Sequence, residues 1–143
     1  MAITTSAITS SFKRQLLGGE HDIANGGNTL KLALYTDSAV IGPGLASYTT
    51  SGEVGNSGDY SAGGKTLQGQ TTSLSGTTAI ADFADLSYLT ATISAMGALI
   101  YNSGVSNKSI AVLDFSTVKT STAGTFTIQF PNYTDTLAII RLA

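Results

Sequence analysis

The stretch TFTIQFP, residues 125–131, indicates the fold class of this chain. Phe126, Ile128 and Phe130 alternate with polar residues, and this period of two predicts a strand with one buried face. Pro131 ends the strand because proline has no N–H to donate to a neighbouring strand. Leu30, Leu32 and Leu34 alternate with other residues in the same way, so the signal recurs far from this stretch.

Segments of this kind fill much of the chain and are separated by Gly, Ser and Asn clusters. The short spacing of these turn signals is typical of an antiparallel sandwich or barrel. We therefore expect a mainly β, single-domain antiparallel β-sandwich of about seven strands with one short N-terminal helix. The predicted strands are residues 30–35, 67–74, 78–86, 93–101, 110–115, 125–130 and 137–142, with a hairpin turn at 75–76 and loops at 102–108 and 116–124.

The N-terminal region predicts an arm followed by the helix. Residues 1–11 are rich in Thr and Ser and are expected to form an extended arm, so that residues 12–143 make up the sandwich domain. A helix is predicted over residues 10–17, capped by Ser10 or Ser11 and ended by Gly18-Gly19. Phe12 and Leu16 are four residues apart and share one helix face.

Residues 37–66 hold 7 of the 16 glycines and one of the two prolines. We expect a long excursion there, with one helical turn near residues 46–54. An excursion of that length within a compact domain is either functional or locally structured.

The composition excludes several classes of function. The 143 residues include one histidine, no cysteine and no tryptophan, and 11% are charged, against about 25% in a typical soluble domain. Disulfides and thiolate metal sites cannot form, and a net charge of −2 without a basic patch argues against nucleic acid. No apolar stretch is long enough to span a bilayer, so no membrane partner is expected.

The low charge also favours assembly. Together with a mean hydropathy of +0.20, it is unusual for a freely soluble monomer. We expect the chain to bury much of its surface in an assembly, the alternative being a Ser/Thr surface adapted to an extracellular setting. Residues 1–11 lack the charged and apolar regions of a signal peptide, so synthesis in the cytoplasm is expected.

Two short motifs could carry enzyme chemistry. Glu20-His21-Asp22 is the one acid–base cluster, but adjacent side chains do not automatically converge, and a solvated loop is the simpler interpretation. Gly64-Lys65-Thr66 resembles the end of a phosphate-binding loop, yet Asp59 stands where the motif needs glycine. We predict that the protein is not an enzyme and has no catalytic residues and no cofactor.

Two sets of residues could bind ligands. Aspartates could reach a calcium ion, although no loop has the spacing of a known calcium site and no metal is predicted. Loop tyrosines could stack on a sugar, although tyrosine is common at any interface. The aspartates are Asp59, Asp82, Asp85 and Asp114, and the tyrosines are Tyr48, Tyr60, Tyr88 and Tyr133.

Three stretches together resemble a family of small tailed-bacteriophage virion structural proteins. They are KLALYT with Ser38-Ala39 (31–39), YTT through GGKTL (48–67), and GALIYN through AVLDF to TFTIQFP (97–131). The resemblance covers roughly residues 12–142, and it implies a β-sandwich that decorates or cements a capsid. It implies no catalytic or metal-binding residues.

The resemblance and the composition lead to one functional prediction and one alternative. We predict a capsid decoration (cement) protein on the outer surface of the virion, with the major capsid protein as partner and a homo-oligomer, a trimer favoured. The arm and the helix are expected to supply the contacts, through Phe12, Lys13, Arg14, Leu16 and Leu17. The alternative is a tail or fibre component that binds host surface glycan.

Overall fold

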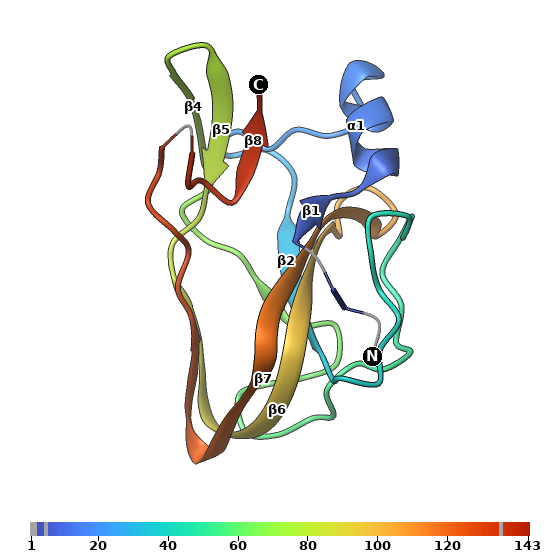
Figure 1. Ribbon diagram of the computed structural model, residues 1–143, viewed down its shortest axis with the longest axis vertical. Helices are drawn as coiled ribbons and strands as arrows, with labels where there is room; N and C mark the ends of the chain where they lie inside the picture. The colour runs from blue at the N-terminus through green and yellow to red at the C-terminus, as the bar shows by residue number, and fades with distance from the viewer. Residues whose placement is uncertain (1–2, 5, 135) are drawn as a thin grey trace.

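The computed structural model describes residues 3–4, 6–134 and 136–143, which form two antiparallel sheets and one helix (Figure 1). The larger sheet has the strand order β1-β7-β6-β2-β3, and the smaller one has the order β4-β5-β8. This arrangement confirms a mainly β chain with one short helix and is compatible with a single-domain β-sandwich. The elements are β1 (Ala7–Ile8), α1 (Ser10–Leu17), β2 (Leu30–Tyr35), β3 (Lys65–Thr66), β4 (Thr71–Ser75), β5 (Thr78–Asp82), β6 (Leu86–Asn102), β7 (Lys108–Ile128) and β8 (Ile140–Leu142).

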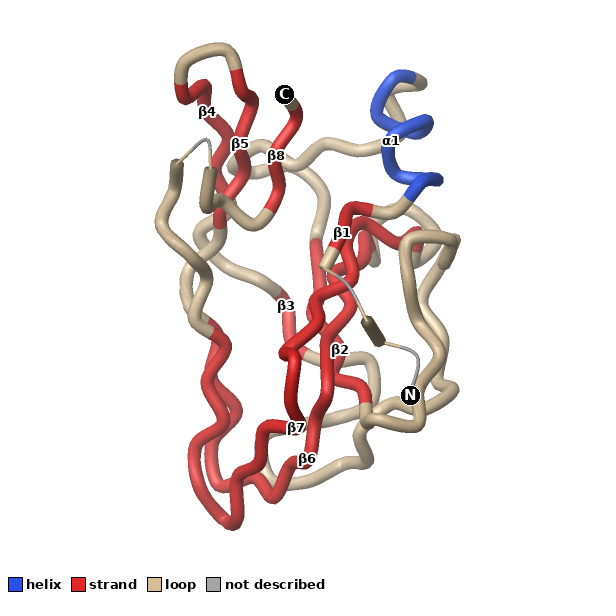
Figure 2. Tube along the Cα trace, in the orientation of Figure 1, coloured by secondary structure: helices blue, strands red, loops and turns tan. Residues whose placement is uncertain are grey.

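One long hairpin, β6–β7, runs through both layers of the molecule. Figure 2 shows it passing beside β2, bending at the end remote from α1, and returning on the side of β4 and β5. The ladder between the two strands is interrupted by register shifts, and Thr90, Ser116 and Ala123 adopt positive φ angles of 52°, 66° and 46°. Bulges of this kind let strands turn a corner from one layer to the other.

Several predicted boundaries are corrected. The predicted loop 116–124 is part of β7, because its Thr, Ser and Val residues favour extended backbone and pair with β6. The predicted strand 78–86 is interrupted at residues 83–85, and the predicted strand 67–74 is replaced by β3 and β4. The central strand is confirmed, but it begins at Leu86 instead of Ile93.

The core has two parts, one on each face of the larger sheet. The main cluster includes Leu30, Leu32 and Leu34 of β2 together with Phe126 and Ile128 of β7. The second cluster lies on the opposite face of β2. Its members are Ile3, Ala33, Tyr35, Ala39, Ile41, Met96, Leu99, Tyr101 and Val112. The N-terminal segment and the long excursion therefore cover a sheet face that would otherwise meet water.

The excursion at 37–66 contains no helical turn, so that prediction is wrong. Its backbone is held to the larger sheet by single bridges from Tyr35 to Glu53 and from Ser47 to Lys108. It is locally structured, which is one of the two possibilities that its length allowed.

The helix α1 has the predicted bounds but a different cap. The side chain of Thr9, and not that of Ser10 or Ser11, accepts a hydrogen bond from the Phe12 N–H. Gly18 and Gly19 follow the helix, and Gly19 has a φ of 71°, a conformation that glycine adopts without strain. In the part of the chain that the structure describes, no helix is long and apolar enough to cross a membrane.

Candidate functional site

The helix carries the predicted partner contacts, and the structure divides them into two groups. Phe12 is fully buried in the main core, so it fixes α1 to the domain and cannot offer surface to a partner. Lys13 and Arg14 are exposed, Leu16 is half-buried, and Leu17 is 93% exposed. The prediction that Phe12 is a contact residue is therefore corrected, while the other four have surface available.

The described residues of the predicted N-terminal arm are not independent of the domain, and its last two, Ser10 and Ser11, belong to α1. Ala7 and Ile8 pair with Val112 and Ala111 of β7, and Ile3 is fully buried in the second cluster. The arm thus gains its order by docking on its own sheet. Deleting residues 1–17 would uncover apolar surface, because Ile3 of the arm and Phe12 of α1 are core residues.

One end of the molecule gathers exposed apolar side chains, and we call it the apical end. It consists of α1, β4, β5 and β8, which Figure 1 draws side by side at the top. Leu17, Leu74 and Leu142 are 93%, 71% and 40% exposed there. Between α1 and the smaller sheet lies a groove of about 220 Å³, whose lining includes Leu16, Ile80 and Leu142. An end of this character is typical of a surface that another protein covers.

The side chains of the Glu20-His21-Asp22 triplet each contact different partners. Glu20 forms ion pairs with Arg14 and Lys108, and the hydrogen bond from Lys108 lowers the pKa of the Glu20 carboxyl. Asp22 accepts a hydrogen bond from the Ala24 N–H two residues later. The triplet therefore organises the segment after α1 and has the geometry of a structural cluster.

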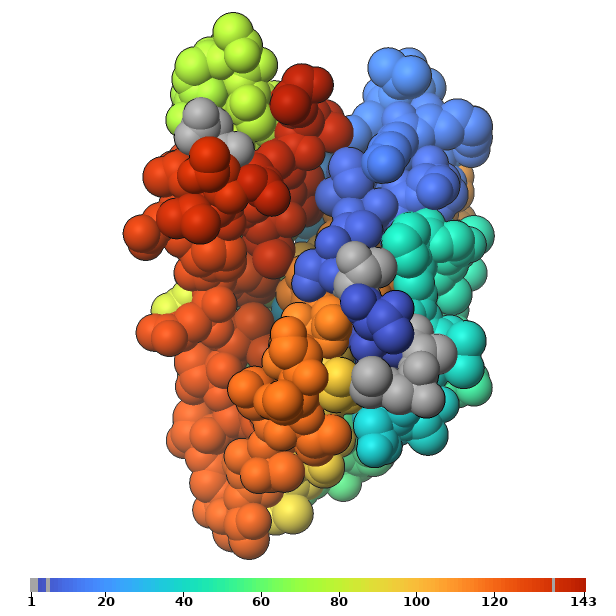
Figure 3. Space-filling model, viewed as in Figure 1, coloured from blue at the N-terminus to red at the C-terminus, as the bar shows by residue number. Residues whose placement is uncertain are grey.

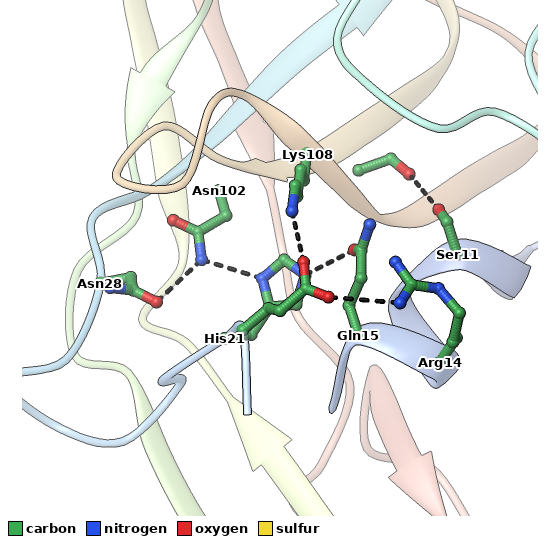
Figure 4. Close-up of polar contacts among 9 residues, drawn as sticks. Ser11, Arg14, Gln15, His21, Asn28, Asn102 and Lys108 are labelled. Carbon is green, nitrogen blue, oxygen red and sulfur yellow. Dashed lines mark hydrogen bonds and ion pairs between the residues drawn. The ribbon is translucent and has the colours of Figure 1, made fainter. Parts of the chain in front are cut away.

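His21 is the centre of a hydrogen-bonded chain that joins α1 to the end of β6. Its Nε2 lies 2.8 Å from Gln15 Oε1, and its Nδ1 lies 2.9 Å from Asn102 Nδ2 (Figure 4). The ring also packs edge-on against Phe12, with 5.0 Å between centroids. Burial, with Lys108 nearby, lowers the pKa of His21. These contacts hold the helix against the domain.

The four tyrosines considered as a sugar platform do not form one exposed surface. Tyr60 and Tyr88 are fully buried and pack edge-on against each other, with 5.0 Å between ring centroids. Tyr48 is half-buried and stacks on Tyr101. The sugar-platform hypothesis is therefore wrong for Tyr60 and Tyr88, and burial raises the pKa of both hydroxyl groups.

The carboxylate of Glu53 accepts hydrogen bonds from the hydroxyl groups of Tyr48 and Tyr60. Tyr48 donates to Oε2 at 2.5 Å, and Tyr60 donates to Oε1 at 2.8 Å. The N–H of Gly63 donates to the same Oε1 at 2.6 Å. One acidic side chain thus ties together distant parts of the excursion, a role that no motif in the sequence signalled.

The remaining candidate groups are engaged in local contacts. Lys65, from the motif that resembles a phosphate-binding loop, lies in strand β3 and pairs with Asp59, which lowers the pKa of the Asp59 carboxyl. Asp85 accepts from the Phe130 N–H, and Asp114 accepts from the Ser116 N–H. Within residues 3–4, 6–134 and 136–143, no group of three His, Cys, Asp or Glu residues is placed to hold a metal ion.

In comparisons with known proteins, no family model, curated protein or solved structure matches this chain.

Sequence reasoning missed the contribution of the smaller sheet to the apical end. Leu74 stands alone among Thr and Ser residues beside the β4–β5 turn, where an apolar residue has no core to enter. A leucine beside a hairpin turn is a usable signal of contact surface. Leu142 gave no such signal, because it falls within a short apolar run.

Proposed function

We propose that this protein is a bacteriophage virion structural protein, a capsid decoration protein that binds the outside of the head shell. The observation that carries the proposal is the apical end, where Leu17, Leu74 and Leu142 are exposed and where Leu16, Ile80 and Leu142 line a groove. The resemblance of residues 12–142 to small virion proteins of tailed phages supports it, as does the 11% content of charged residues.

The proposed mechanism is association without chemistry. Neutral polar and apolar surface costs less to remove from water than charged surface does, so this composition suits a permanent contact. Many copies on one shell would add their contacts, and modest individual affinities would then give firm attachment. A homo-oligomer, with a trimer favoured, would match the three-fold positions of a shell.

The structure changes which residues should be tested. Removing residues 1–17 would expose the pockets of Ile3 and Phe12, so a loss of binding by that deletion would report unfolding. Leu17 is a sharper probe, because it is 93% exposed at the last position of α1. Val40, 79% exposed in the excursion and outside the lining of the apical groove, is a matched control.

The first experiment is binding to purified empty head shells, with cryo-electron microscopy of the decorated particles. We expect density for the protein on the outer surface of the head, with the apical end of the protein toward the shell. Leu17→Glu should reduce the number of bound copies, whereas Val40→Glu should not, and both variants should keep the circular dichroism of the parent. Density on the tail and no binding to heads would contradict the proposal and favour the tail or fibre alternative, for which glycan binding is the next test.

A further inference from the structure

Two sheet edges face each other across a groove on the front of the molecule. β1 is one of the two outer strands of the larger sheet, and β8 is one of the two outer strands of the smaller one. The groove between them has a volume of about 530 Å³ and is lined by residues 6–8, 111–113, 137–139 and 141–143 together with Lys13. Figure 3 shows the hollow between the red C-terminal segment and the blue and orange segments opposite.

Each of these two strands lines the groove and has a strand partner on one side only among the described residues. Among the described residues, β1 pairs with β7 alone and β8 pairs with β5 alone. The other side of an outer strand presents backbone N–H and C=O groups that can pair with an incoming extended chain. An extended segment that adds to such an edge gains affinity from the backbone and specificity from its alternate side chains.

The chemistry of the groove describes the segment that fits. Ile8, Leu137 and Ile139 keep accessible apolar surface in the lining, which suits apolar side chains on one face of a strand. Lys13 and Arg141 stand in the same lining, and neither belongs to the ion pairs formed among the described residues. No Asp or Glu side chain is among the described residues that line the groove. Two cationic side chains beside two sheet edges favour a segment that carries an acidic residue.

A second copy of this chain fits the β8 edge poorly. Antiparallel pairing of β8 with its own copy about Arg141 would place two guanidinium groups opposite each other. Like charges directly opposite in a ladder are destabilising. Charge complementarity therefore selects a foreign, acidic partner over self-association.

We propose that the groove between β1 and β8 accepts an extended, acidic segment of the capsid protein, which adds as a strand to one of the two edges. The inference rests on the proposed function and identifies how the partner is held. The apical end and the groove share Leu142, so one partner can cover both surfaces.

The test combines charge reversal with hydrogen exchange on empty head shells. The double variant Lys13→Glu/Arg141→Glu should bind shells roughly tenfold more weakly than the parent. The matched control is Lys119→Glu, which reverses an exposed charge on β7 outside the groove. In shell-bound parent protein, amide exchange of residues 6–8 and 140–142 should be slower than in the unbound protein.

Three other outcomes of these experiments would overturn the inference, and they can be told apart. Full binding by the double variant, or slowing confined to regions outside β1 and β8, would show that the shell is bound without the groove, and the decoration function would stand. Slowing of the same amides at high protein concentration without shells would assign the groove to a second copy. No binding of the parent to shells would overturn the decoration function and this inference together.

Discussion

Asn102 donates a hydrogen bond from Nδ2 to Nδ1 of His21, with 2.9 Å between the two nitrogens. The amide cannot be reversed, because Asn102 Oδ1 accepts from the Gly104 N–H and Nδ2 also donates to Asn28 Oδ1. That oxygen in turn accepts from the backbone N–H of Asp22. Nδ1 of His21 must therefore carry a lone pair, and the neutral ring holds its proton on Nε2, facing Gln15.

Protonation of His21 is expected to destabilise the fold. Its pKa in the folded state lies below the ordinary value of 6.5, so the unfolded chain binds this proton first. The contribution is fully present above about pH 6.5 and is lost as the pH falls from there through the lowered pKa. Melting temperatures measured between pH 7 and pH 5 should fall, before the carboxylates titrate.

The same residue gives its own control, because it is the one histidine in the chain. A single ring-proton signal should titrate below pH 6.5 in the nuclear magnetic resonance spectrum. His21→Gln should flatten the dependence of melting temperature on pH in that window. A titration at or above 6.5 would contradict the assigned hydrogen-bond pattern.

Gly64 is expected to tolerate no side chain. Its φ is 77°, and an added Cβ would collide with the backbone carbonyl of Leu32. Gly64→Ala should cost more than about 4 kcal/mol of unfolding free energy, measured by urea titration. Gly76→Ala is the control, with a φ of 61° and open space around it, and should cost about 1–2 kcal/mol. Equal losses in the two variants would refute the close approach.

Glu53→Gln tests the anchor of the excursion. The carboxylate accepts from Tyr48, Tyr60 and Gly63, whereas an amide would turn one acceptor into a donor that faces another donor. The expected loss is roughly 1–3 kcal/mol of unfolding free energy. Denaturant unfolding measures it, with Tyr48→Phe as a milder comparison. An unchanged stability would mean that the excursion is held by its apolar contacts alone.

Ile3→Ala tests whether the arm belongs to the domain. Ile3 is fully buried against the outer face of the larger sheet, where its Cγ2 would lie 2.8 Å from a Cβ added to Gly97. The substitution should cost about 2–4 kcal/mol, whereas the exposed neighbour Thr4→Ala should change stability by less than about 0.5 kcal/mol. Thermal unfolding of the two variants would separate a docked arm from a loose one, since a loose arm predicts no difference.

The regular parts of the fold were predictable because their signals are local. The bounds of α1 and β2 follow from turn residues and from alternation within a few positions. The path of β7 could not be predicted from the sequence. Its exposed Thr and Ser residues have no hydrophobic period, and they are extended because they pair with β6. A strand that is polar on both faces has no local signature of its own.

The candidate site was predictable only in part for a related reason. Leu17 is the last residue of a short helix and was expected at the surface. Phe12 was misassigned because its burial depends on the sheet that packs over it, and the groove between β1 and β8 depends on two strands about 130 residues apart in sequence. Such long-range relationships are set by the topology, which periodicity cannot supply.

The pairing of Ala7 with Val112 also constrains how the chain acquires its structure. The arm leaves the ribosome well before its partner strand, which lies more than a hundred residues later in the sequence. Contacts so distant in sequence form slowly, because the entropy of closing a large loop is lost before the contacts can stabilise the chain. During synthesis the N-terminal segment therefore stays exposed until β7 has emerged. A nascent chain halted before that strand would leave Ile3 and Ile8 without their packing partners and accessible to chaperones.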